Sequence, residues 1–209
     1  MVDGIESGCW AGEPYKTPSL GVVSAHPLMV ADGNHRVAAA TAAGLDGLLA
    51  LVTAGPGLRI NAFHRVLVDT GFDADTLKEA WRGLGLEVRE APDALAPVLP
   101  GTVVVRCGDR SLFVELPRAD AADPTPRIDH AVVENLLLHK ALGLDPEGPH
   151  VRTLPDGRDP GPDAEAVLLL APVPLDDVLA VHAAGGRMPR KSTYFTPKPR
   201  SGLLLADLG

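Results

Sequence analysis

The chain has 209 residues, enough for one sizeable domain, and 45% of them are hydrophobic but only 4% aromatic, so its core must be built from Leu, Val and Ala. A formal charge of −8 argues against nucleic-acid binding through a basic surface. No apolar run approaches membrane-spanning length, no secretion signal is visible, and Cys9 and Cys107 have no metal or disulfide spacing. We therefore expect a soluble cytoplasmic protein with reduced thiols, which binds neither nucleic acid nor membrane.

Residues 1–26, which are rich in Gly, Pro and Ser, are expected to be irregular. The next segment, residues 28–44, carries the most informative pattern of the chain. A short apolar run predicts a buried strand, Asp32-Gly33 predicts a tight turn, and the alanine-rich stretch that ends at Gly44 predicts a helix.

His35 and Arg36 therefore stand where strand becomes helix, next to free backbone N–H groups and the positive end of the helix dipole. An arginine adds a planar set of donors that matches phosphate or carboxylate. The simplest hypothesis is a pocket for a nucleotide phosphate. The alternative is a structural turn in which Asp32 caps the helix and Arg36 pairs with a surface carboxylate.

Further along the chain, residues 48–52 predict a second buried strand. The strand-like stretch 58–68 is followed by a helix that Asp73 or Asp75 caps and that runs to Leu84. A strand at 86–88, a short helix at 91–97 and a hairpin of strands 102–107 and 111–116 come next.

The proline-rich residues 117–127 are expected to form an exposed loop or linker, after which Asp129 caps a helix that stops near Gly143. The remaining predictions are a turn-rich stretch at 144–163, a buried strand at 166–171, a helix at 175–184 and a last strand at 203–205. Because βα units and a hairpin are mixed, we predict an α+β (mixed α/β) fold, with residues 1–209 as a single domain.

A basic, proline-stiffened segment at residues 188–200 stands out in an otherwise acidic protein. Lys191 and Lys198 offer point charges for phosphate oxygens, and Ser192 and Thr193 offer hydrogen bonds. The alternative is an exposed basic loop or a phosphorylation target.

The pair His64-Arg65 interrupts an apolar stretch, so one of the two should face a site or a partner charge. The alternative is an edge-strand pair whose polar groups are satisfied within the fold.

Three strings occur in this order: Ala-Asp-Gly-Asn-His-Arg at 31–36, Phe-His-Arg at 63–65 and Met-Pro-Arg-Lys-Ser-Thr-Tyr-Phe-Thr-Pro-Lys at 188–198. Together they resemble the signature of a widespread prokaryotic family, the domain of unknown function 1015. This chain has Asn34 where the family usually has His and Phe63 where it usually has Thr. Typical members also carry a much longer region ahead of the Asp-Gly string.

The Asp-Gly-x-His-Arg string is also similar to the nucleotide-phosphate motif of the ParB/sulfiredoxin-like superfamily, which includes free-serine kinases. This resemblance implies a ParB/sulfiredoxin-like nucleotide-binding core with appended elements, and ATP or ADP with Mg²⁺ as cofactors. It implies catalytic roles for Asp32, which would orient the acceptor hydroxyl or a magnesium ion, His35 and Lys191. The cofactor-binding residues that it implies are Gly33, Asn34, His35, Arg36, His64, Arg65, Lys191, Ser192, Thr193 and Lys198.

Three functions stay open. The first is a nucleotide-dependent kinase that phosphorylates a small hydroxylated amino acid such as free serine, with Glu6, Glu13 or Asp32 as general base. The second is a non-catalytic nucleotide- or metabolite-binding protein that lost its chemistry with the N-terminal region. The third is a tailoring enzyme on the same scaffold. The sequence leaves open whether the chain forms a homo-oligomer or takes a partner chain.

Overall fold

The computed structural model describes residues 30–45, 47–48, 50, 57–117 and 126–198. The chain forms two compact units, one made of Met1–Arg59 and Phe195–Gly209 and the other of Ile60–Tyr194. The single domain expected over residues 1–209 stays a prediction.

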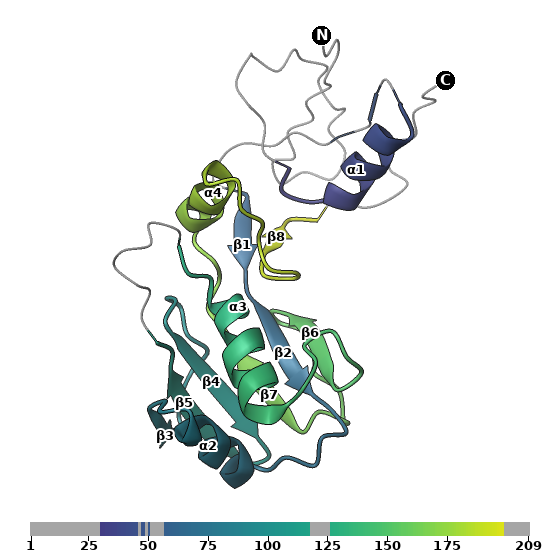
Figure 1. The fold of residues 1–209 in the computed structure, drawn as a ribbon. Helices are drawn as coiled ribbons and strands as arrows, with labels where there is room; N and C mark the ends of the chain where they lie inside the picture. The colour runs from purple at the N-terminus through teal and green to yellow at the C-terminus, as the bar shows by residue number, and fades with distance from the viewer. Residues whose placement is uncertain (1–29, 46, 49, 51–56, 118–125, 199–209) are drawn as a thin grey trace. The chain divides into compact units, whose positions relative to one another are not determined.

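The larger unit, Ile60–Tyr194, is built on a six-stranded antiparallel sheet with the strand order β3-β5-β4-β7-β2-β6 (Figure 1). Its strands are β2 (Phe63–Leu67), β3 (Val88–Glu90), β4 (Thr102–Cys107), β5 (Arg110–Glu115), β6 (Val151–Pro155) and β7 (Ala166–Leu169). With helices packed on this sheet, the α+β fold class is confirmed.

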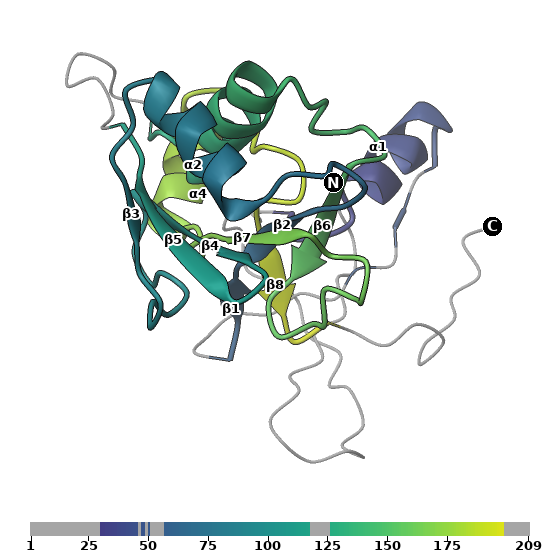
Figure 2. The same cartoon turned by 90° about the horizontal axis from the view of Figure 1, so that it is seen from below.

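Helix α2 (Ala74–Gly83) and the continuous helix of α3 (Asp129–Val132) and the π-helix η1 (Val133–Lys140) lie on the same face of the sheet (Figure 2). Side chains of that sheet face, of α2 and of η1 form the hydrophobic core, in which Leu77, Trp81 and Leu137 are fully buried. Helix α4 (Leu175–Ala183) follows β7. Strands β1 (Arg59–Asn61) and β8 (Tyr194–Thr196) form a second, two-stranded sheet through which the boundary between the units passes.

Local sequence signals explain α2 and the β4–β5 hairpin. The carboxylate of Asp73 caps α2 by accepting a hydrogen bond from the backbone N–H of Thr76 at 2.8 Å, as the sequence predicts. Cys107 pairs with Arg110 across the hairpin turn, where Gly108 has a φ of 60° that favours glycine. Both elements are confirmed.

Other expectations for this unit are wrong in detail. Residues 91–97 form a turn and an open segment instead of a helix, because Pro97 lacks a backbone N–H donor and disfavours helical geometry at Ala96. Asp129 begins a helix but does not cap it, since its carboxylate accepts from the N–H of Gly101 at 2.7 Å. Strand β6 lies within the stretch 144–163, which is expected to be rich in turns and for which no strand is predicted, because pairing with β2 and not a local pattern defines this strand.

In the smaller unit, the described residues include helix α1 (Asn34–Ala42), which confirms the predicted helix. The strands expected at 28–30 and 48–52 are not seen where residues are described: Val30 is 42% and Leu48 43% exposed, and neither lies in a strand. None of the described side chains of α1 is buried.

Residues 1–26, most of 117–127 and the strand expected at 203–205 lie outside the described residues. Among the helices that the structure describes, none has the length and apolar character needed to span a bilayer.

Trp81 gives the first prediction. Its indole Nε1–H donates to the carbonyl oxygen of Leu137 in η1 at 3.1 Å, and both residues are fully buried. Trp81→Phe leaves that carbonyl without its donor, so we expect the free energy of unfolding to fall by about 1–3 kcal/mol. Urea denaturation followed by circular dichroism measures the change. The control Leu179→Ala, at an exposed position of α4, should change stability by less than about 0.5 kcal/mol.

Candidate functional site

The described residues of the predicted site form two groups, one in each unit. The first is the turn that begins α1. Gly33 is the N-cap residue with a left-handed φ of 89°, no side chain caps the helix, and its first turn holds no acidic residue. The positive end of this nine-residue helix is therefore not neutralised by a capping group of its own. The side chains of Asn34 and His35 lie outside the described residues.

Arg36 folds back over this turn. A Cβ atom placed on Gly33 would stand 2.9 Å from Nη2 of Arg36, so the guanidinium lies directly against the glycine. Glycine is favoured here by its positive φ, and a Cβ would also push the flexible guanidinium of Arg36 aside. The side chain of Arg36 is nevertheless exposed, which leaves it accessible to an anion.

Asp32 accepts a hydrogen bond from the N–H of Gly33 at 2.9 Å and forms an ion pair with Nζ of Lys198 at 2.9 Å. The hydrogen bond from Lys198 lowers the pKa of Asp32, although partial burial opposes this effect. The carboxylate is therefore ionised at neutral pH and is better suited to bind a cation or a hydroxyl than to take up a proton. It does not cap α1, in contrast to the structural alternative drawn from the sequence.

The second group surrounds Arg65, which is fully buried in β2. Its Nε and Nη2 donate to Oε1 of Glu134 at 2.9 and 2.7 Å. Its Nη1 donates to the carbonyl oxygens of His64 at 3.1 Å and Lys191 at 3.2 Å, and Nη2 also donates to that of Arg190 at 3.1 Å. All five N–H groups of the guanidinium are therefore used inside the protein.

The segment 189–193 is built around this arginine. Lys191 has a φ of 49°, in the left-handed region, and its side chain is exposed. Its Nζ lies 5.7 Å from the centre of the Phe63 ring. The ring of Phe63 also packs against that of Tyr194, with 5.4 Å between the ring centres. Ser192 is 1% exposed, and its hydroxyl donates to the carbonyl of Pro189 at 2.7 Å. The hydroxyl of Ser192 is thus used within the loop, whereas Lys191 is exposed and Thr193 half-buried.

His64 is also engaged at both ring nitrogens. Its Nδ1 accepts from the N–H of Leu170 at 3.2 Å, which places the proton on Nε2, facing Oδ1 of Asp156 at 3.4 Å. Burial lowers the pKa of His64, against the effect of Asp156, and keeps the imidazole neutral. In this structure the polar atoms of His64, Arg65 and Ser192 hold the fold together and are not directed to a ligand.

Sequence reasoning missed two residues of this group, Glu134 and His130. Glu134 lies in the predicted helix but outside its apolar stripe of Val132, Val133, Leu136 and Leu137, so no sequence signal points to it. His130 carries no such signal: it is fully buried, its Nε2 lies 2.9 Å from the carbonyl oxygen of Phe63, and its Nδ1 has no partner among the described residues. Nor does the described part of the chain hold a cluster of His, Cys, Asp or Glu that fits a metal ion.

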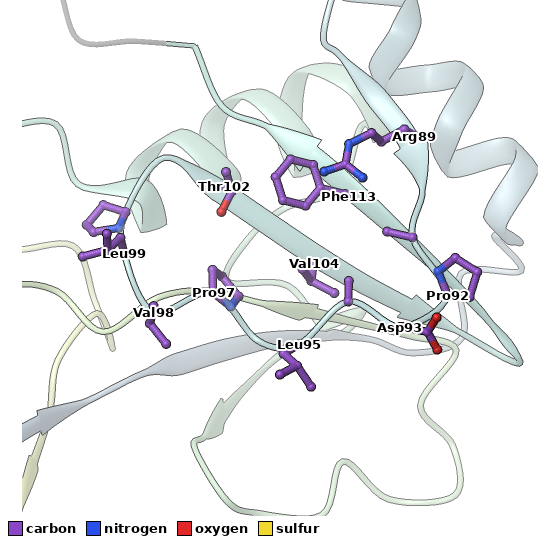
Figure 3. Close-up of a pocket in the computed structure, with 13 residues that line it drawn as sticks. Arg89, Pro92, Asp93, Leu95, Pro97, Val98, Leu99, Thr102, Val104 and Phe113 are labelled. Atoms are coloured by element: carbon purple, nitrogen blue, oxygen red, sulfur yellow. The ribbon is translucent and has the colours of Figure 1, made fainter.

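A separate apolar groove of about 610 Å³ lies between residues 91–100 and the sheet face formed by β4 and β5 (Figure 3). Arg89 lies over the ring of Phe113 at 4.1 Å, and Leu95, Val98 and Leu99 are strongly exposed at its edge. None of the residues predicted for the phosphate site lines this groove.

Comparison with known proteins finds no matching family model and no matching curated protein. Several solved structures are similar in fold. A mutant free serine kinase in complex with AMP has a TM-score of 0.49 and 14% identity, and a mutant free serine kinase in complex with ADP has a TM-score of 0.48 and 14% identity. A conserved hypothetical protein from Pyrococcus furiosus has a TM-score of 0.46 and 14% identity, with 79% of this chain and 68% of that one covered.

The alignment with both kinase structures covers 79% of this chain, which spans 66% of their length. At this identity and with TM-scores below 0.5, the likeness carries no conclusion about what this chain binds. The family resemblance therefore depends on the strings of the sequence itself.

The buried His130 predicts how stability depends on pH. Burial lowers its pKa to about 3, whereas an unfolded histidine titrates near 6.5. Between these values the unfolded chain takes up the proton more readily, so stability is lost as the pH falls through this window, by up to about 1.4 kcal/mol per pH unit. Urea denaturation of wild type and His130→Gln between pH 7.5 and 4.5 measures the two slopes. The Gln variant should lose stability less steeply.

The exposed His182 of α4 provides the control for this experiment. His182→Gln should follow the pH dependence of the wild type. Equal slopes for wild type and His130→Gln would show that His130 does not titrate in this way.

Proposed function

We propose that the protein is a nucleotide-dependent kinase that binds ATP or ADP with Mg²⁺ and phosphorylates the hydroxyl group of a small amino acid such as free serine. The observation that carries this proposal is the group of anion-binding features at the start of α1. There an uncapped helix N-terminus, the exposed guanidinium of Arg36 and the ammonium of Lys198 belong to one unit. The resemblance of the 31–36 string to the nucleotide-phosphate motif of the ParB/sulfiredoxin-like superfamily supports the same assignment.

Phosphoryl transfer depends on positioning and charge stabilisation more than on covalent groups of the protein. In this proposal the N–H groups of the first turn of α1 and Arg36 hold the phosphates. Lys198, in the same unit, contributes a second positive charge. The low pKa of Asp32 suits it to bind Mg²⁺ or to orient the acceptor hydroxyl. The general base is then one of the glutamates Glu6 and Glu13, which lie outside the described residues.

A second function, nucleotide binding without catalysis, is favoured by a specific observation. Several side chains that the resemblance implies as ligand contacts have their polar atoms used within the protein: Arg65, His64 and Ser192. In addition, Asn34 replaces an imidazole by a neutral amide in the phosphate motif. Both functions need the same phosphate site, and turnover separates them.

Arg36 provides the test of the phosphate site. Thermal unfolding is followed with ATP, ADP, CTP, pyrophosphate or phosphate, each with Mg²⁺. At 100 times the dissociation constant, a bound nucleotide should stabilise the wild type by about 2.7 kcal/mol. In Arg36→Ala this stabilisation should be lost, because the guanidinium no longer faces the phosphate. Arg152→Ala, at an exposed arginine of the other unit, should keep it.

Gly33→Ala is the matched variant that leaves the net charge unchanged. A Cβ at this position conflicts with the positive φ and displaces the guanidinium of Arg36, so nucleotide binding should weaken here as well. Nucleotide stabilisation that survives in both variants would contradict the phosphate assignment.

Turnover is measured by ³¹P NMR with MgATP or MgADP and free serine. A kinase should form a phosphate monoester only when the acceptor is present, and Asp32→Asn should reduce the rate by at least 10-fold. Nucleotide binding without any turnover over a panel of hydroxylated amino acids would favour the second function. If no nucleotide stabilises the wild type, the kinase proposal is wrong.

A further inference from the structure

The apolar groove beside β4 and β5 lies on the sheet face opposite to the hydrophobic core. Successive side chains of a strand point to opposite faces of the sheet, and Val105 and Leu112 belong to the core that α2 and η1 cover. Val104 and Phe113 therefore point away from these helices, and both line the groove (Figure 3). The loop of residues 91–100 forms its other wall.

This loop is fixed at both ends. The backbone N–H of Ala91 donates to the carbonyl oxygen of Ser111 in β5 at 2.8 Å. The N–H of Gly101 donates to the buried carboxylate of Asp129 at 2.7 Å. Three prolines within the loop restrict its backbone further. Such a loop is ordered before anything binds to it, so little conformational entropy is lost on association.

The outer side of the loop is apolar and exposed. Leu95, Val98 and Leu99 are 80%, 82% and 72% exposed. Leu95 and Val98 are directed away from Phe113 (Figure 3). Single exposed apolar residues are common on monomeric proteins, but three large ones on a fixed loop next to an apolar groove are typical of a protein–protein contact. This arrangement favours a protein surface that covers the loop and the groove together.

Two charges of opposite sign lie at the same groove. Arg89 and Asp93 both line it, and both are exposed. The guanidinium of Arg89 contacts the ring of Phe113, but within the described part of the chain neither Arg89 nor Asp93 forms an ion pair. A complementary surface would therefore offer a carboxylate to Arg89 and a cation to Asp93. A second copy of this chain offers both. In a contact with two-fold symmetry the same patch is used on both molecules, so Arg89 of each copy can meet Asp93 of the other.

We propose that the groove and the loop of residues 91–100 form the two-fold interface of a homodimer. The exposed apolar side chains of the loop in one copy lie in the groove of the other. Two symmetry-related ion pairs between Arg89 and Asp93 fix the orientation of the two copies. The inference is independent of the proposed function, because none of the residues predicted for the phosphate site lines this groove.

The size of this surface determines the affinity that we expect. Thirteen residues line the groove, whereas an interface of standard size uses about 20–30 residues on each side. The dimer should therefore be weak, with a dissociation constant on the order of 10 μM. Sedimentation velocity of the whole chain between about 1 and 300 μM brackets this value, and the wild type should change from monomer to dimer in this range.

Charge reversal tests the pairing across the interface. Arg89→Glu places a carboxylate opposite Asp93, and Asp93→Arg places a guanidinium opposite Arg89, in both cases twice per dimer. Each variant alone should raise the dissociation constant at least about 10-fold, because like charges then face each other. An equimolar mixture of the two variants should associate within about threefold of the wild type, since both ion pairs of the mixed dimer join opposite charges. Mixing cannot repair a defect in the fold of either variant.

Val98→Asp tests the apolar part of the contact. It takes an unpaired carboxylate into the interface and should raise the dissociation constant at least about 10-fold. The position is exposed in the monomer, so circular dichroism should show an unchanged fold. Arg158→Glu is the matched control for charge reversal. It changes an exposed arginine in the turn after β6, at the other end of the six-stranded sheet from β3, and it should dimerise within about twofold of the wild type.

Three results would overturn the inference, and each has a different meaning. A wild type that stays monomeric up to about 300 μM would show that a second copy does not occupy the groove. A dimer that persists unchanged in Val98→Asp and in both charge variants would use a different surface. Weaker association of both charge variants without recovery on mixing would show that Arg89 and Asp93 do not meet across the interface.

Discussion

The larger unit depends on the burial of one positive charge, the guanidinium of Arg65. Burial lowers its pKa, and the carboxylate of Glu134 opposes this effect. Removing a single partner from such a pair leaves an uncompensated charge, which is far more costly than losing a surface ion pair. The compensation comes from η1 and from the backbone of residues 190–191, so three segments distant in sequence meet at the buried arginine. The ion pair therefore favours one specific arrangement of sheet, helix and loop.

The π-helix η1 is the element through which core packing and this ion pair act on each other. Its fully buried Leu137 accepts the indole N–H of Trp81 from α2, while Glu134, one turn earlier, accepts two hydrogen bonds from Arg65. A shift of η1 along its axis would break both contacts at once. The packing of α2 against η1 thus also fixes the position along the helix axis at which Glu134 contacts Arg65.

Sequence patterns predicted the elements that local signals determine. The cap at Asp73, the hairpin turn at Gly108 and the helices α1 and α4 depend on residues only a few positions apart. The patterns failed for elements and side chains whose structure depends on residues distant in the sequence. Strand β6 is defined by its pairing with β2, and the role of Arg65 was not predictable without knowing that Glu134 faces it. The sequence did indicate that the pair His64-Arg65 needed partners, and it left open whether these belong to a functional site or to the fold.

Whether a polar group is exposed or buried decides which residues of the candidate site are available to a ligand. The pair of Asp32 and Lys198 is exposed, and such pairs contribute little to stability, about 0–1 kcal/mol, so this ion pair can open at small cost. The guanidinium of Arg65 cannot be withdrawn in this way, because its five donors are buried with their acceptors. Among the residues predicted for the site, exposed positive charge is thus found at Arg36 and Lys198 in one unit and, separately, at Lys191 in the other. The backbone carbonyl of Lys191, in turn, accepts a hydrogen bond from the buried Arg65.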